Sequence, residues 1–183
     1  MKTKKHTNLG SMPCPVARSL DRVGEWWSIL ILRDAMTGLT RFDEFAKSLG
    51  IAPNILTRRL NDLVEAGMLE KRQYSEKPPR YEYHLTELGW SFRTVMQAFV
   101  DWGNRHFFPE GRMVQLVERA TGRPVRVGLM DLDTGRPLNA EEYTMAPGPA
   151  ADASVKQRFA YLAAKHEGGT EQLQAKPKRG KSK

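Results

Sequence analysis

Apolar residues recur at helical spacing between positions 12 and 105, whereas both ends of the chain are polar. The first periodic stretch covers residues 15–36, and its apolar positions are Val16, Leu20, Val23, Trp27, Leu30 and Ile31. Pro13 and Pro15 indicate where this stretch begins. Gly24 interrupts it, so the pattern predicts two short helices rather than one long helix.

The next two apolar stretches predict a helix-turn-helix. Thr40 and Asp43 match a capping box, so a helix is expected to begin there and to end in a tight turn at Gly50. A second helix is expected from Pro53 to Ala66, because proline is tolerated in the first turn. Its buried stripe would be Leu56, Leu60 and Leu63. Two helices joined by a glycine-containing turn are typical of this DNA-binding motif.

A hairpin and a further helix follow. Residues 68–74 and 80–85 have strand character, and Pro78 and Pro79 in the loop between them favour an exposed hairpin tip. Helix, helix and basic hairpin in this order describe a winged helix. A long helix is then expected over 87–104, and its wide apolar face is formed by Phe92, Val95, Met96, Phe99 and Trp102.

Several short motifs follow one another through this region. In chain order they include Cys14-Pro15-Val16, Trp27-Ser28-Ile29-Leu30-Ile31-Leu32-Arg33-Asp34, Arg41-Phe42-Asp43-Glu44-Phe45, Leu49-Gly50-Ile51-Ala52 and Pro78-Pro79-Arg80-Tyr81-Glu82-Tyr83. As an ordered set they resemble the HxlR-type regulators, a branch of the MarR-like winged-helix transcription factors. Trp26 departs from the family, which usually has a basic residue at that position. The resemblance implies a bacterial, homodimeric, DNA-binding regulator.

The predicted fold is therefore mainly α with a small β wing (α+β). A winged helix-turn-helix domain for DNA binding and dimerisation is expected over 12–105, an extension over 106–173, and disordered basic tails over 1–11 and 174–183. The extension is expected to form a small β-meander from 113–119 and 125–130 and then a helix over about 152–166. The string Thr121-Gly122-Arg123-Pro124 recurs as Thr134-Gly135-Arg136-Pro137 and predicts two similar turns.

Candidate DNA contacts lie on the second helix of the helix-turn-helix and on the wing. Because the recognition helix enters the major groove, we expect its open side to face the base edges, and this side carries Asn54, Thr57 and Arg58, with Arg59 at its margin. Lys77 and Arg80 flank the hairpin tip and would follow the backbone or enter the minor groove. Arg41, Lys47 and Arg59 are weaker backbone candidates. Alternatively, the Arg58-Arg59 pair is only a solvated helix face.

Winged-helix repressors usually act in pairs, so a dimer surface is expected. The candidates are aromatic or large apolar residues from the amino-terminal helices and from the 87–104 helix: Trp26, Trp27, Phe92, Val95, Met96, Phe99 and Trp102. The alternative is that this apolar face packs only within the monomer.

Cys14 is the single cysteine, so no intrachain disulfide can form and no thiolate metal cluster is expected. Some regulators of the resembled family sense oxidants through a cysteine near the amino end, which makes Cys14 a candidate redox sensor; a buried structural thiol is the alternative.

The extension is either an effector-binding or dimer-stabilising lobe or a segment that simply packs on the winged helix. The sequence is therefore compatible with a small-molecule or redox effector of unknown identity.

The net charge of +8 is located in the tails. Residues 1–10 carry three basic side chains and residues 174–183 carry five, with no acid in either segment.

The sequence lacks an apolar stretch long enough to span a membrane, so a cytoplasmic protein with double-stranded DNA as its partner is expected. The four histidines are far apart and no phosphate-binding glycine loop occurs, which argues against an enzyme or a cofactor. The rival function is a winged-helix protein-interaction module.

Overall fold

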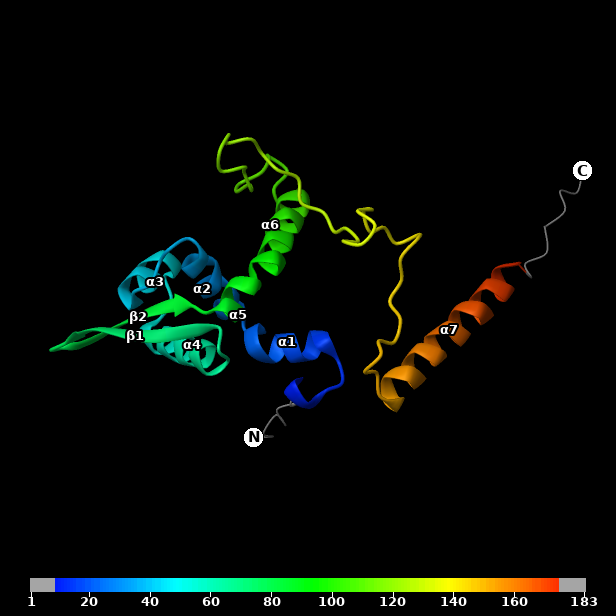
Figure 1. Ribbon diagram of the computed structural model, residues 1–183, viewed down its shortest axis with the longest axis horizontal. Coiled ribbons are helices and arrows are strands. Elements are labelled where there is room, and N and C mark those ends of the chain that lie inside the picture. Colours follow the sequence, from blue (N-terminus) through cyan, green and yellow to red (C-terminus); the bar gives the residue numbers. More distant parts are fainter. Residues whose placement is uncertain (1–8, 175–183) are drawn as a thin grey trace, which may run out of the picture.

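The computed structural model describes residues 9–174, with side chains described up to residue 165 (Figure 1). Its elements are η1 (Leu9–Ser11), α1 (Pro15–Val23), α2 (Trp26–Met36), α3 (Phe42–Leu49), α4 (Pro53–Glu65), β1 (Leu69–Glu76), β2 (Pro79–Leu85), α5 (Glu87–Ser91), α6 (Arg93–Phe107) and α7 (Ala153–Gln174). The predicted mainly helical fold with a two-stranded wing is confirmed. Almost all of both predicted tails lies outside the described residues.

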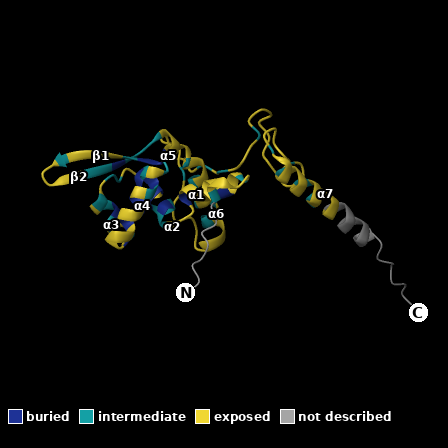
Figure 2. Ribbon diagram, turned by 90° about the horizontal axis from the view of Figure 1, so that it is seen from below, coloured by how far each residue is buried: buried dark blue, intermediate teal, exposed yellow. Residues whose placement is uncertain are grey.

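The core forms where α2, α3 and α4 meet the base of the hairpin. Several side chains there are completely buried: Ile31, Leu32, Phe45, Leu56, Leu60 and Leu63. Met68, Leu69 and Tyr83 extend this core into the wing. Figure 2 shows the same division, with buried residues on α2 and α4 and exposed residues along the outer parts of the hairpin and α7. The three predicted leucines of α4 thus form its buried stripe.

The turns around α2 and α3 follow local rules. Gly24 separates α1 from α2, as predicted, and a Cβ there would overlap the carbonyl oxygen of Leu20. The predicted capping box is wrong by one residue, because Glu44 rather than Asp43 closes it. The amides of Thr40 and Arg41 donate to the Glu44 carboxylate at 2.9 and 2.8 Å. These backbone hydrogen bonds lower the pKa of Glu44 and fix the start of α3.

The wing is an antiparallel pair that projects beyond the helices (Figure 1). Its register runs from Leu69 opposite Leu85 at the base to Glu76 opposite Pro79 near the tip, so the loop is shorter than predicted. The amide of Tyr83 donates to the carbonyl of Thr40 at 2.7 Å. This bond attaches the middle of β2 to the segment just before α3.

The single helix predicted over 87–104 is wrong: the chain forms α5 and α6, which meet at Phe92. Thr86 accepts a hydrogen bond from the amide of Gly89 and donates to the carbonyl of Gly67, so the first turn is fastened to the start of β1. Gly89 packs so closely on the carbonyl of Met68 that a Cβ would overlap it. The direction of α5 is therefore set by the wing, and the chain turns at Phe92 before α6 begins.

The predicted meander is also wrong. Between residues 106 and 152, all of which the structure describes, there is no strand, only two single antiparallel bridges. These join Val117 to Pro124 and Met130 to Pro137. Each bridge is flanked by two backbone hydrogen bonds, donated by the amides of Glu118 and Val125 at the first and of Asp131 and Leu138 at the second, so each hairpin is a single bridged pair beside its turn. The prediction of two similar turns is confirmed, since both contain a glycine in the left-handed region, with φ +71° at Gly122 and +70° at Gly135.

The helix α7 is longer than the predicted 152–166 helix and stands apart from the winged helix in both views (Figures 1 and 2). The expectation that this part of the extension packs on the winged helix is therefore wrong. In the described part of the chain, no helix has the length and apolar character needed to cross a membrane.

Candidate nucleic-acid interface

The helix α4 has two chemically different sides. Its inner side carries the leucine stripe, which is completely buried. Its outer side carries Asn54, Thr57 and Arg58, all exposed. Helical spacing separates the two sets, because residues three or four apart share a side. The predicted open side of this helix is therefore accessible.

The first turn of α4 presents its backbone as well as its side chains. Ala52 is the residue before the helix and provides no side-chain cap, and Pro53 occupies the first helical position. The hydroxyl of Thr57 donates to the carbonyl of Pro53 at 2.8 Å, which fixes this side chain against the helix. Its oxygen lone pairs remain able to accept hydrogen bonds. Uncapped amides at a helix amino end are suited to phosphate.

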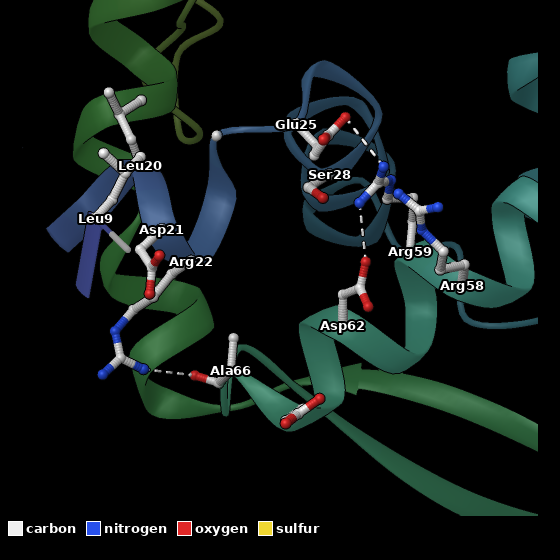
Figure 3. A pocket seen from close by; sticks show the side chains of 12 residues that line it. Leu9, Leu20, Asp21, Arg22, Glu25, Ser28, Arg58, Arg59, Asp62 and Ala66 are labelled. Atoms are coloured by element: carbon white, nitrogen blue, oxygen red, sulfur yellow. Dashed lines mark hydrogen bonds and ion pairs between the residues drawn. The ribbon is translucent and has the colours of Figure 1, made fainter. Parts of the chain in front are cut away.

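Arg58 and Arg59 are neighbours in sequence but have different surroundings, as Figure 3 shows. Arg58 has no carboxylate partner among the described residues. Arg59 is 8% exposed, and its guanidinium contacts Glu25 at 3.0 Å and Asp62 at 2.9 Å. This burial and pairing argue against the predicted backbone contact between Arg59 and DNA. Instead, Arg59 ties α4 to the start of α2.

The sequence contained a signal for this role. Position 59 lies three residues after Leu56 and four before Leu63. This spacing puts it on the inner side of the helix rather than at the margin of the outer side. Asp62 follows at i+3, a spacing at which side chains on a helix meet. The partner on α2, Glu25, could not be identified by spacing, because the tertiary packing of α2 on α4 brings it there.

The wing presents its basic tip to solvent. Lys77 and Arg80 are both exposed, and neither has an ion-pair partner in the described part of the chain. The predicted placement of these two cations on either side of the tip agrees with the structure. Their contact with DNA stays a prediction.

Arg41 is exposed but is already paired within its own chain, and its contact with the DNA backbone stays a prediction. Its Nε donates to the Glu82 carboxylate at 3.0 Å, and its guanidinium lies 4.7 Å from the centre of the Tyr74 ring. The hydrogen bond raises the pKa of Arg41 and lowers the pKa of Glu82, which also contacts His84 at 3.2 Å. Arg41 therefore attaches the wing to the start of α3, and Lys47 on α3 remains exposed.

The predicted dimer residues of α6 fall into two groups. Phe92 and Met96 pack against the core of their own chain. Val95, Phe99 and Trp102 are 45–50% exposed and occupy one side of the helix at positions i, i+4 and i+7. The monomer therefore does not cover this side of α6.

The tryptophan pair at the start of α2 divides in the same way. Trp27 packs against the core, whereas Trp26 is 61% exposed. Their ring centroids are 4.1 Å apart in a stacked arrangement, so Trp27 supports Trp26 at the surface. Only Trp26 of the two is available to a partner.

Cys14 is a free thiol of intermediate exposure at the residue before α1. Arg18, one turn later, donates from Nε to the carbonyl of Met12 at 2.9 Å. This contact orders the segment around the thiol. The sensing role stays a prediction, and a Cys14→Ser variant that still released DNA on oxidation would contradict it.

Comparison with known proteins agrees with this geometry. Residues 22–110 match the model of the HxlR-like helix-turn-helix family. The uncharacterised HTH-type transcriptional regulator Rv3095 of Mycobacterium tuberculosis is 36% identical over 141 residues, which cover 76% of this chain and 89% of that protein.

Two solved structures are also similar. PA1374 of Pseudomonas aeruginosa, a candidate transcription factor, is 60% identical with a TM-score of 0.60, and the match covers 79% of this chain and 99% of that chain. PA1607, another candidate transcription factor, is 44% identical with a TM-score of 0.70 over 78% and 100% of the two chains. These relatives are regulators of transcription and not enzymes. The chain belongs to the HxlR-like helix-turn-helix family of transcriptional regulators.

Proposed function

We propose that the protein is a homodimeric, sequence-specific DNA-binding regulator that acts in the bacterial cytoplasm. The observation that carries this proposal is the outer side of α4, where Asn54 and Arg58 are exposed beside an uncapped first turn. Asparagine can pair bidentately with adenine and arginine with guanine, each pair contributing about 1–3 kcal/mol of discrimination. In this account α4 lies in the major groove.

The wing supplies the second contact. Residues 74–80 would follow the phosphate backbone or enter the minor groove, with Lys77 and Arg80 as the cations. Phosphate contacts orient a protein on the duplex without reading sequence. Arg41 contributes indirectly, because its bond to Glu82 holds the wing in place.

The dimer would use the uncovered side of α6. Val95, Phe99 and Trp102 form an apolar surface that a twofold partner can bury. The two α4 helices would then read half-sites separated by one or more turns of DNA, about 34 Å each. Sedimentation tests this: a dimer is expected at micromolar concentration, and a Phe99→Glu variant should sediment as a monomer. A stable wild-type monomer would contradict the dimer.

The function is tested by capturing bound fragments across the genome and footprinting them. A palindromic site, protected in two major-groove segments, is the expected result. Failure to find any site preferred over random DNA at physiological salt would contradict sequence-specific binding. That failure is also what a winged-helix protein-interaction module would give.

A further inference from the structure

A small pocket lies between α2, α6 and the first turn of the extension, away from the outer side of α4. Its volume is about 210 Å³. Its apolar lining comes from all three segments: Met36 from α2, Met96 and Val100 from α6, and Leu116, Val125 and Val127 from the extension. None of the preceding roles uses this pocket.

The extension is fastened over α6 by specific hydrogen bonds. The side-chain amide of Asn104 donates to the carbonyl of Val114 at 2.7 Å and accepts from the amide of Met113 at 3.1 Å. The amide of Val125 donates to the carbonyl of Leu116 at 2.9 Å and closes the turn. These bonds make the apolar wall a defined structure built from residues beyond the winged helix.

The charged residues at this pocket leave a positive excess. Arg33 is paired with Asp34 at 2.8 Å, and Asp101 is paired with Arg105 at 2.6 Å. Arg93 and Arg112 also line the pocket, and neither has a carboxylate partner within the described residues. Two unpaired guanidinium groups beside an apolar cavity are complementary to an organic anion.

The volume limits the size of such an anion. A cavity of about 150 Å³ accommodates benzene, so 210 Å³ is suited to a single ring with a small substituent or to a short acyl chain. We propose that this pocket binds a small organic carboxylate, whose apolar part lies among the methionine and valine side chains and whose carboxylate pairs with one of the two unpaired arginines, Arg93 or Arg112.

Such a ligand would be placed to affect the dimer. Helical spacing puts Arg93, Met96 and Val100 on one side of α6 and the exposed apolar residues Val95 and Phe99 on the other. A ligand that contacts both α2 and α6 would set the position of α6 relative to the winged helix. This regulatory consequence rests on the proposed function, whereas ligand binding itself does not.

Binding is tested on the full chain with benzoate as the probe and benzamide as its neutral analogue. Saturable binding of benzoate is expected, with a Kd at or below about 1 mM in an NMR titration or calorimetry, and benzamide should bind at least tenfold more weakly. Absence of saturation by benzoate, phenylacetate and hexanoate at about 10 mM would overturn the proposal.

Variants locate the site. Arg93→Gln combined with Arg112→Gln should weaken benzoate at least tenfold, and Val127→Trp should abolish binding by filling the cavity. Arg126→Gln is the matched control, because Arg126 is exposed between two lining valines but is not itself part of the lining. Equal benzoate affinity in the wild type and the double variant would overturn the assignment. If the protein binds benzoate but shows no DNA-site preference, the ligand site is supported and the proposed function is contradicted.

Discussion

The two sides of α4 differ in burial and in the pairing of their charged residues. On the inner side Arg59 is 8% exposed and held between Glu25 and Asp62, beside completely buried leucines. On the outer side Arg58 is exposed and has no carboxylate partner among the described residues. Adjacent residues of the same type therefore differ in their availability to a partner, because burial and pairing, not residue type, decide whether an arginine is accessible.

The largest expected effect is on the inner side. Leu60→Ala should lower the free energy of unfolding by about 2–5 kcal/mol, because it removes completely buried methyl groups and leaves a cavity. Urea unfolding, monitored by circular dichroism, measures this loss of stability. Asn54→Ala on the outer side is the control, with an expected change within about 0.5 kcal/mol. Similar losses in both variants would remove the distinction between the sides.

The arginine pair tests the same distinction with one residue type. Arg59→Ala should lower the free energy of unfolding by about 1–3 kcal/mol, since it removes the hydrogen bond to Asp62 and the ion pair with Glu25 that joins α4 to the start of α2. Arg58→Ala should leave unfolding unchanged within about 0.5 kcal/mol. Thermal and urea unfolding of the two variants measure these changes. A larger loss of stability in Arg58→Ala would contradict the assignment of Arg59 to the inner side and Arg58 to the outer side.

Wing contacts should affect affinity but not base preference. Lys77→Ala is expected to weaken binding to all sequences similarly and to reduce the slope of log affinity against log salt by about one. Fluorescence anisotropy at several salt concentrations measures this slope. Lys156→Ala on α7 is a control of equal charge change, and an unchanged slope for Lys77→Ala would exclude a phosphate contact at the tip.

The smallest expected effect is the pH dependence of wing attachment. The hydrogen bond from Arg41 lowers the pKa of Glu82 below its ordinary value of 4.5, so the carboxylate stabilises the folded wing at pH above that value. This stabilisation should be lost as pH falls through the lowered pKa. The protection factor of the Tyr83 amide, which corrects for the intrinsic pH dependence of hydrogen exchange, should fall in that range, and Arg41→Ala should reduce this fall. The same fall in the protection factor in Arg41→Ala would contradict the role of the pair.

Local patterns allowed most of the winged helix to be predicted. The leucine stripe of α4, the break at Gly24 and the exposed wing tip all follow from spacing or from glycine and proline chemistry. The errors arise where distant segments meet. The burial of Arg59 depends on Glu25, and the bend at Phe92 depends on how α5 is fastened to β1. Neither partner lies within the window from which a periodicity is read.

The extension was predicted less well for a different reason. Its strand-like segments do pair, but each pairing is a single bridge beside the turn, at Pro124 and at Pro137, and composition does not show how far a ladder extends. The repeated turn sequence was the more reliable signal, because the left-handed backbone at Gly122 and Gly135 is a local property. The pocket that this segment completes with α2 and α6 depends on tertiary packing.

The central claim is that the outer side of α4 reads bases. Selection of bound sites from a random DNA library, performed with the wild type and with Asn54→Ala combined with Arg58→Ala, tests it most directly. The account predicts a palindromic wild-type site and loss of preference for at least one base pair in each half-site of the variant, about 1–3 kcal/mol of discrimination for each lost bidentate contact. Selection of the same site with undiminished preference by the variant would contradict it.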